Sequence, residues 1–90
     1  MKIVFLPVGW EHYLYWAAND PKMLARVNVL LEDARRSPFA GIGKPEPLRD
    51  NLSGWWSRRI DSEHRLVYRV AGKGEGQVLE IMQCRFHYGK

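Results

Sequence analysis

A single carboxylate stands among basic side chains in the middle of the chain. Glu46 lies in Lys44-Pro45-Glu46-Pro47-Leu48-Arg49, where a proline on each side restricts the backbone and holds the carboxylate in a defined direction between two cations. Near the end of the chain, His87 and Tyr88 place an imidazole beside a phenol. A carboxylate that accepts a proton and an imidazole that donates one are the groups that general acid–base catalysis requires. The simpler interpretation is that these are solvated surface residues.

Arginine provides nine of the fourteen basic side chains, and its planar guanidinium can donate two parallel hydrogen bonds to one phosphate. If the turn between the two strands that flank Asp61-Ser62-Glu63 is centred on Ser62, Arg59 faces Arg65 across a hairpin. Arg69 then points to the same side. Opposed like charges destabilise a sheet, and a bound anion would offset the repulsion. A solvated sheet face with screened charges is the alternative.

Together these groups match the needs of RNA cleavage without a metal ion. In that reaction the 2′-hydroxyl attacks the adjacent phosphate, so one proton leaves the nucleophile and another must reach the departing 5′ oxygen. Negative charge grows on the nonbridging oxygens, where guanidinium groups can stabilise it. Glu46 as the base, His87 as the acid and the arginine pair would supply all three functions.

Other chemistries find weaker support. The chain has no phosphate-binding loop of the required spacing, and Gly72-Lys73-Gly74-Glu75-Gly76 lies between two predicted strands, where a hairpin turn is expected. Cys84 and His87 supply only half of a zinc site, so we expect no metal site and no cofactor. Cys84 lies within an apolar strand, where a buried thiol behaves as a small hydrophobic side chain rather than as a nucleophile.

Composition limits the chain to one small globular domain spanning residues 1–90. The chain carries a formal net charge of +4, and 46% of its residues are hydrophobic and 12% aromatic, which excludes disorder. The single cysteine excludes a disulfide scaffold. The first apolar run, Ile3 to Leu6, is too short for a membrane span or a signal peptide, so we expect a cytoplasmic protein with no membrane contact.

The elements that must position these residues follow from apolar periodicity. In chain order they are a strand (1–6), a helix whose face holds Trp10, Tyr13, Leu14 and Ala17, a second helix between Asp20-Pro21 and Ser37-Pro38, and three strands (55–60, 65–70 and 78–86). Residues 39–54 show no such pattern, and a loop of that length usually carries function. The order βααβββ predicts an α+β fold, in which a two-helix hairpin packs on one face of an antiparallel sheet.

Simple alternation does not direct His87 toward the arginine face. Counting in twos along the last strand places His87 on the same face as Leu79 and Ile81, with the apolar side chains. Either a β-bulge or the end of strand pairing must therefore turn the imidazole.

Ordered motifs along almost the whole chain resemble one family. They are Tyr13-Leu14-Tyr15-Trp16, Arg35-Arg36-Ser37-Pro38-Phe39, Gly43-Lys44-Pro45-Glu46-Pro47-Leu48, Asn51-Leu52-Ser53-Gly54 followed by Trp56-Ser57-Arg58-Arg59-Ile60, Glu63-His64-Arg65-Leu66-Val67-Tyr68, and the terminal Cys84-Arg85 and His87-Tyr88. The chain resembles the YoeB toxins of the RelE superfamily, bacterial ribosome-dependent mRNA interferases of type II toxin–antitoxin pairs. The family commonly has lysine where this chain has Arg49, and here Gly89-Lys90 follow the histidine–tyrosine pair.

The resemblance implies a microbial-ribonuclease-like fold and cleavage of mRNA in the A site of the 70S ribosome. It implies that Glu46 is the general base, Arg65 the transition-state stabiliser and His87 the general acid, and that Tyr88 positions the substrate. The basic side chains expected to bind the substrate are Lys44, Arg49, Arg59 and Arg85. A YefM-like antitoxin would cover or distort the site with a partly disordered segment, and the toxin would be a homodimer in that complex.

A noncatalytic RNA- or ribosome-binding module is the competing interpretation. Arginines would then hold phosphates, and the four tryptophans would stack on bases. Such a module needs no proton transfer, so loss of cleavage on changing Glu46 distinguishes the two. A DNA-binding repressor is a third interpretation, but no helix-turn-helix pattern is visible and both helices are needed for the core.

Overall fold

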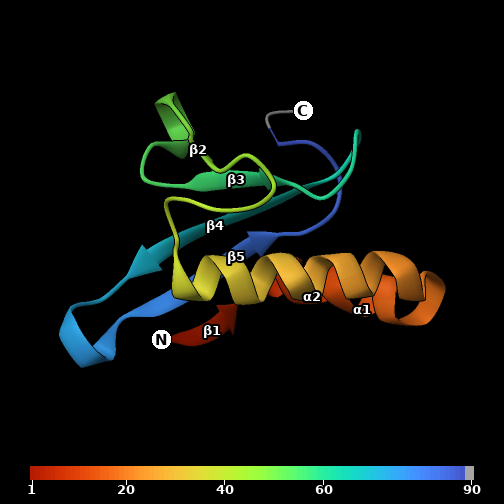
Figure 1. Ribbon diagram of the computed structural model, residues 1–90, viewed down its shortest axis with the longest axis horizontal. Helices are drawn as coiled ribbons and strands as arrows, with labels where there is room; N and C mark the ends of the chain where they lie inside the picture. The colour runs from red at the N-terminus through yellow and green to blue at the C-terminus, as the bar shows by residue number, and fades with distance from the viewer. Residues whose placement is uncertain (89–90) are drawn as a thin grey trace.

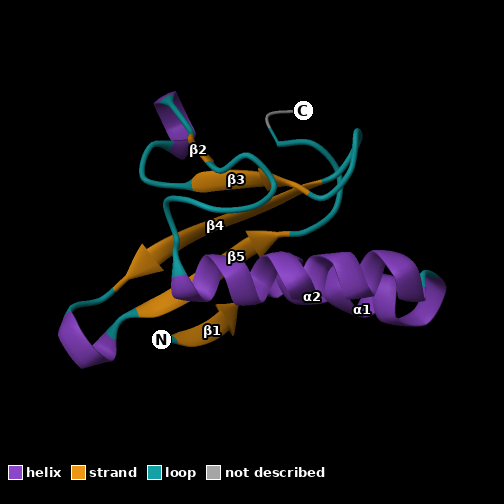
Figure 2. Cartoon of the chain, in the orientation of Figure 1, coloured by secondary structure: helices purple, strands orange, loops and turns teal. Residues whose placement is uncertain are grey.

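Two helices and a five-stranded sheet form two layers in the computed structural model, which describes residues 1–88 (Figure 1). The helices α1 (Pro7–Asn19) and α2 (Pro21–Arg36) lie side by side across one face of the sheet (Figure 2). The predicted α+β class and its two-layer arrangement are confirmed. Gly89-Lys90 lie outside the described residues.

The sheet has the strand order β1-β5-β4-β3-β2. Its members are β1 (Lys2–Phe5), β2 (Glu46–Pro47), β3 (Trp56–Arg59), β4 (Arg65–Ala71) and β5 (Val78–Gln83). The strands β2 to β5 pair antiparallel, whereas β1 runs parallel to β5. The predicted sheet was antiparallel and had four strands, so the structure corrects both details. The parallel pair is possible because the helical hairpin supplies the crossover that parallel strands need.

Local signals set the bounds of α2. The Asp20 side chain caps the helix by accepting a hydrogen bond from the Met23 backbone N–H at 3.2 Å, and Pro21 occupies the first helical position. One apolar stripe is buried against the sheet: Val27, Leu30, Leu31 and Ala34. The helix ends at Arg36, just before Ser37-Pro38, as the sequence predicted.

The buried face of α1 differs from the predicted one. Trp10 and Leu14 are each 47% exposed, whereas Trp16 is buried in the core. Gly9 lies so close to β5 that an added Cβ would stand 2.5 Å from the carbonyl oxygen of Ile81. Apolar side chains surround α1, so spacing alone could not select the face that this close approach requires. No helix among residues 1–88 is both long and apolar enough to cross a membrane.

The hairpin of β3 and β4 has the predicted register. Arg59 pairs with Arg65 and Ser57 with Val67, so the side chains that alternate with them, such as Tyr68, point toward the helices. The opposite face of the sheet is not merely solvated. An apolar outer cluster covers part of it, built from buried Leu48, Trp55 and Val67 with Leu6, Leu52, Met82 and Tyr88 packed against them.

Candidate functional site

The edge strand β2 places Glu46 on the outer face of the sheet. Glu46 pairs with Ser57 of β3, and directly opposed residues of an antiparallel pair point to the same side. Pro45 and Pro47 lack a backbone N–H, which an edge strand tolerates because one side of it needs no hydrogen-bond partner. The Leu48 backbone N–H donates to the carbonyl oxygen of Trp55 at 2.9 Å and continues the pairing. Strand pairing therefore fixes the backbone that carries the exposed carboxylate of Glu46.

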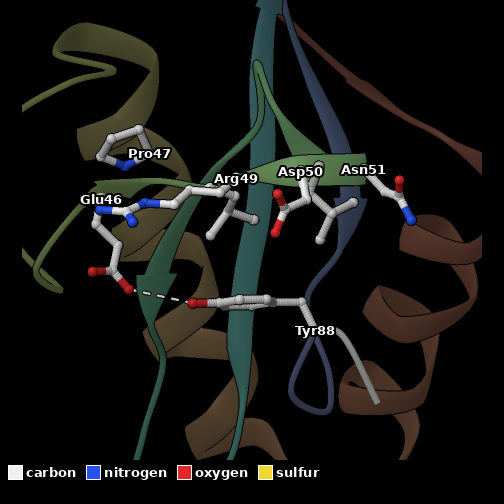
Figure 3. A pocket seen from close by; sticks show the side chains of 8 residues that line it. Glu46, Pro47, Arg49, Asp50, Asn51 and Tyr88 are labelled. Atoms are coloured by element: carbon white, nitrogen blue, oxygen red, sulfur yellow. Dashed lines mark hydrogen bonds between the residues drawn. The ribbon is translucent and has the colours of Figure 1, made fainter.

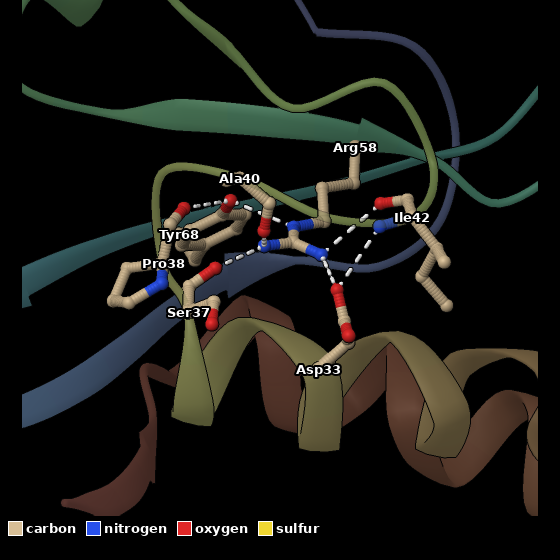
Figure 4. A network of polar contacts seen from close by, with 7 residues as sticks. All are labelled: Asp33, Ser37, Pro38, Ala40, Ile42, Arg58 and Tyr68. Atoms are coloured by element: carbon tan, nitrogen blue, oxygen red, sulfur yellow. Dashed lines mark hydrogen bonds and ion pairs between the residues drawn. The ribbon is translucent and has the colours of Figure 1, made fainter.

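A fully buried arginine holds the loop that leads into β2 (Figure 4). All five N–H donors of Arg58 have acceptors: the hydroxyl of Tyr68 at 2.8 Å, the carboxylate of Asp33, and the carbonyl oxygens of Ser37 at 2.6 Å, Ala40 at 2.9 Å and Ile42 at 3.0 Å. The bond from Arg58 and one from the Ile42 backbone hold the pKa of Asp33 below its ordinary value. The interaction fixes α2, β3, β4 and the loop over residues 37–42 in one arrangement.

The segment that follows β5 brings Tyr88 to Glu46. The Tyr88 hydroxyl donates to Oε1 of Glu46 at 3.3 Å, and Figure 3 shows the two side chains pointing toward one another. They line an open depression of about 710 Å³ on the outer face. Its other lining residues are Pro47, Leu48, Arg49, Asp50, Asn51 and Leu52. The structure thus brings together three of the candidate site residues, Glu46, Arg49 and Tyr88.

His87 lies next to this depression rather than in it. Its ring stacks on the Tyr88 ring with centroids 4.6 Å apart and planes at 25°, and its Nδ1 is 2.7 Å from the Tyr88 carbonyl oxygen. The exposed imidazole lines a second depression of about 550 Å³. Arg85 lines that second depression too, so the structure groups Arg85 with His87 and not with Glu46.

A register shift accounts for the direction of His87. Val67 pairs with Gln83 but Tyr68 pairs with Ile81, which leaves Met82 as an extra residue on β5. Met82 packs on the outer cluster, whereas Cys84 lies in the core under the helices, so alternation changes phase at the bulge. Strand pairing also ends at Gln83, earlier than predicted. Both of the anticipated explanations, a bulge and the end of pairing, therefore apply.

The outward-facing arginines have different surroundings. Arg65 is largely buried, and its Nη1 donates to the carbonyl oxygens of Asp61 at 2.8 Å and His64 at 3.1 Å. Arg59 pairs with Arg65 across the hairpin and is exposed, so its side chain is less constrained than that of Arg65. The structure therefore brings Arg59 and Arg65 together as expected, and the carbonyl contacts reduce the repulsion between them.

Arg69, on the same face, is already satisfied within the protein. It forms an ion pair with Glu80 at 2.7 Å, and its guanidinium lies 4.3 Å from the centroid of the Trp55 ring. This arginine has no need of a bound anion.

Arg85 is enclosed by aromatic rings. Its guanidinium carbon lies 3.5 Å from the centroid of the Tyr15 ring and 4.3 Å from that of the Phe86 ring, and its buried Nε has no hydrogen-bond acceptor among the described residues. Lys44 has a positive φ of 52° directly before Pro45. Both cations are thus near the chain segments that carry the candidate acid and base, Arg85 next to His87 and Lys44 next to β2.

Three features were not identified from the sequence. Asp50 shares the depression with Glu46, so the carboxylate has a second acid nearby, although residues 1–88 contain no group of three or more side chains suited to hold a metal ion. The network around Arg58 had one available signal, an arginine on the apolar side of β3. His12 and His64 accept backbone hydrogen bonds from the segment after β5, and nothing in their spacing indicated this.

Cys84 is buried as predicted, although it follows β5 rather than lying within it. Burial raises the pKa of its thiol to about 12, so the group stays protonated at neutral pH. A protonated, inaccessible thiol is a poor nucleophile.

Known toxins are similar to this chain over nearly its whole length. A family model described as the YoeB-like toxin of bacterial type II toxin-antitoxin systems matches residues 5–88. The YoeB toxin of Synechocystis is 56% identical over 88 residues, which cover 98% of both chains. A YoeB/ParE toxin structure from Agrobacterium tumefaciens is 52% identical, with a TM-score of 0.94 over 98% of this chain and 100% of that chain.

Staphylococcus aureus YoeB has been solved as a dimer and in a heterotetrameric YoeB-YefM toxin–antitoxin complex. In both structures it is 44% identical to this chain, with a TM-score of 0.85 over 98% of each chain.

Proposed function

The chain belongs to the family of YoeB-like toxins of bacterial type II toxin–antitoxin systems, and from that premise we propose that it is an endoribonuclease that inhibits translation. Its substrate is mRNA in the A site of the 70S ribosome, which would place its action in the cytoplasm. The observation that carries the proposal is the hydrogen bond between Tyr88 and Glu46. It joins a carboxylate, a phenol and a stacked imidazole in one surface region beside basic side chains.

Each proposed step assigns a proton to one group. The Glu46 carboxylate takes the proton of the 2′-hydroxyl as the O2′–P bond forms, and His87 gives a proton to O5′ as the P–O5′ bond breaks. The products are a 2′,3′-cyclic phosphate and a 5′-hydroxyl. Arg65 stabilises the negative charge on the nonbridging oxygens, and Arg59 binds the phosphate beside it. Tyr88 lines the depression with Glu46 and stacks on His87, and it positions the substrate between the base and the acid.

The remaining cations extend this surface. Arg49 lines the depression with Glu46, and Lys44 precedes β2, so both can bind flanking phosphates. Arg85 is next to His87, where its enclosed charge would help to hold the departing end of the RNA.

A YefM-like antitoxin is the proposed partner. The S. aureus relative is seen as a dimer and as a heterotetramer with YefM, which supports an antitoxin partner and a toxin dimer for this chain. A partly disordered segment of the antitoxin would cover the depression around Glu46 or displace Tyr88 from it. Either contact would stop cleavage without unfolding the toxin.

End mapping of a message incubated with ribosomes and the toxin tests the proposal. We expect cuts at A-site codons that leave 5′-hydroxyl ends. The Glu46→Ala variant should lose cleavage and keep ribosome binding. If the wild-type protein binds ribosomes but leaves the message intact, the chain is a noncatalytic binding module instead.

A further inference from the structure

Two imidazole rings hold the three residues between β5 and His87. The backbone N–H of Cys84 donates to Nδ1 of His12 at 3.2 Å, and the backbone N–H of Phe86 donates to Nδ1 of His64 at 2.7 Å. His12 lies on α1 and His64 directly precedes β4, so the rings reach the segment 84–86 from different elements. They accept its hydrogen bonds where the sheet no longer does.

The carbonyl oxygens of the same segment are bound as well. Nε1 of Trp16 donates to the Cys84 oxygen at 2.7 Å, and the backbone N–H of Arg65 donates to the Phe86 oxygen at 3.0 Å. Phe86 has a φ of 67°, a left-handed conformation that is unfavourable for a bulky side chain unless the surroundings impose it. The contacts at Phe86 therefore maintain a turn that the isolated backbone would not keep.

Each of the two imidazole rings also packs against a neighbouring aromatic side chain. His64 lies edge-on to Trp16 with centroids 4.9 Å apart, and His12 lies edge-on to Phe86 at 5.6 Å. Only 12% of the His64 side chain is exposed. Both imidazoles are therefore oriented by packing, which keeps their Nδ1 atoms directed at the backbone.

We propose that His12 and His64 are positioning residues, which set the direction in which the chain carries Tyr88 to the Glu46 depression and His87 to the place beside it. The inference rests on the proposed function, in which His87 and Tyr88 serve RNA cleavage. His64 lines neither depression, and His12 lines the second one. In this scheme both act through their backbone hydrogen bonds to the segment 84–86.

The hydrogen bonds make this arrangement sensitive to protonation. Each Nδ1 must be unprotonated to accept an N–H, so each ring is neutral with its hydrogen on Nε2. A second proton would place an N–H on Nδ1 against the backbone N–H and break the bond. The charged and titratable groups facing the rings are Glu11, Arg85 and His64 around His12, and Asp61, Glu63 and His12 around His64.

Burial, aided by Arg85, lowers the pKa of His12 from its ordinary value of 6.5. A lowered pKa means that the folded protein disfavours the proton. The stability that the neutral ring contributes is present above pH 6.5 and is lost as the pH falls through the lower folded value.

Backbone amide exchange in the full chain tests the segment directly. At pH 8 the N–H groups of Cys84 and Phe86 should be protected. The protection of Cys84 should fall as His12 gains a proton on acidification, after correction for the intrinsic exchange rate. His64→Ala should remove the protection of Phe86 at both pH values. His64→Asn should keep it at both, because the Asn Oδ1 occupies the place of Nδ1 and does not titrate.

Cleavage kinetics test the link to function. We expect His64→Ala to lower kcat by about 100-fold with KM unchanged, since a displaced catalytic group costs about that much. His64→Asn should restore kcat. Tyr13→Phe is the matched control, because it removes a 2.8 Å hydrogen bond to Asn28 one residue from His12 without touching the segment.

The outcomes distinguish a failure of the positioning role from a failure of the proposed function. If Phe86 stays protected in His64→Ala, or if His64→Asn is as inactive as His64→Ala, the positioning role is wrong. If the wild-type protein binds ribosomes but leaves the message intact, the proposed function is wrong, whatever the exchange data show.

Discussion

The hydroxyl of Tyr88 donates to Oε1 of Glu46 at 3.3 Å and joins two segments that are 42 residues apart. The bond connects the segment after β5 with the edge strand β2, although β4 and β3 lie between these strands in the sheet. Tyr88 also packs on the outer cluster and stacks on His87. Tyr88 therefore contacts both the candidate base, Glu46, and the candidate acid, His87. A substitution at either residue can change the position of the other through Tyr88.

This shared contact with Tyr88 predicts that substitutions of Glu46 and His87 do not add. Glu46→Gln removes the proton acceptor and His87→Gln the donor, and both groups act in one step. The double variant should therefore cleave little more slowly than the slower single variant, measured as single-turnover rates on programmed ribosomes. Rate losses that multiply would show that one of the two residues serves another step, and full activity of either single variant would remove that residue from the reaction.

Arg65→Lys should slow cleavage with little effect on ribosome affinity. The substitution keeps the charge but loses the planar fork, which meets the phosphate more strongly as charge develops. We expect kcat to fall about 10²- to 10³-fold, the usual cost of removing one preorganised donor. Arg59→Lys is the comparison, because Arg59 lies opposite and is exposed, and it should affect binding more than kcat. Equal losses in rate and affinity for Arg65→Lys would assign Arg65 to binding.

Local sequence signals determined several parts of this fold that could be predicted. The Asp20 cap fixed the start of α2, and a turn centred on Ser62 fixed the register that pairs Arg59 with Arg65. Each depends on residues close in the chain. The position of Glu46 between two cations was equally visible, because the prolines restrict its neighbours.

Contacts between distant segments account for what could not be predicted. The buried face of α1 depends on how closely Gly9 approaches Ile81, and the direction of His87 depends on the extra residue Met82. Neither the close approach of Gly9 nor the extra residue Met82 produces a periodic pattern in the sequence. The outer cluster is likewise formed by side chains such as Leu48 and Tyr88, which come from a loop and from the segment after β5.

Arg58→Met should destabilise the protein by about 3–5 kcal/mol, the usual effect of removing one partner of a buried ion pair. Asp33 and the loop carbonyl oxygens would lose their donors, and the loop before Glu46 would lose its attachment to β3. Urea unfolding measures the change. Arg69→Met is the matched control, because Arg69 pairs with Glu80 at an exposed site and should cost less than about 1 kcal/mol. Similar losses for the two variants would contradict a structural role specific to Arg58.

Acid should weaken the same network. Bonds from Arg58 and from the Ile42 backbone lower the pKa of Asp33 below its ordinary value of 3.8. A lowered carboxyl pKa contributes stability above the unfolded value, and that stability is lost as the pH falls through the folded pKa. Asp33→Asn should therefore be less stable than the wild type at neutral pH and lose less stability below pH 3.8. Unfolding curves that keep the same pH dependence in Asp33→Asn would place the acid-sensitive group elsewhere.

The last prediction is that cleavage needs no divalent metal ion. A metal would stabilise the charge that grows on the phosphate, but Arg65 and Arg59 already supply positive charge at that face of the sheet. Asp50 makes the test worthwhile, because its carboxylate lines the same depression as Glu46 and two carboxylates with a phosphate can hold Mg²⁺. Cleavage should continue at the same rate in EDTA. The assay must use free RNA, if the protein cleaves it, or control for ribosome integrity, because chelation also dissociates ribosomes. Activity that is lost in EDTA and restored by Mg²⁺ would instead assign Glu46 and Asp50 to a metal ion.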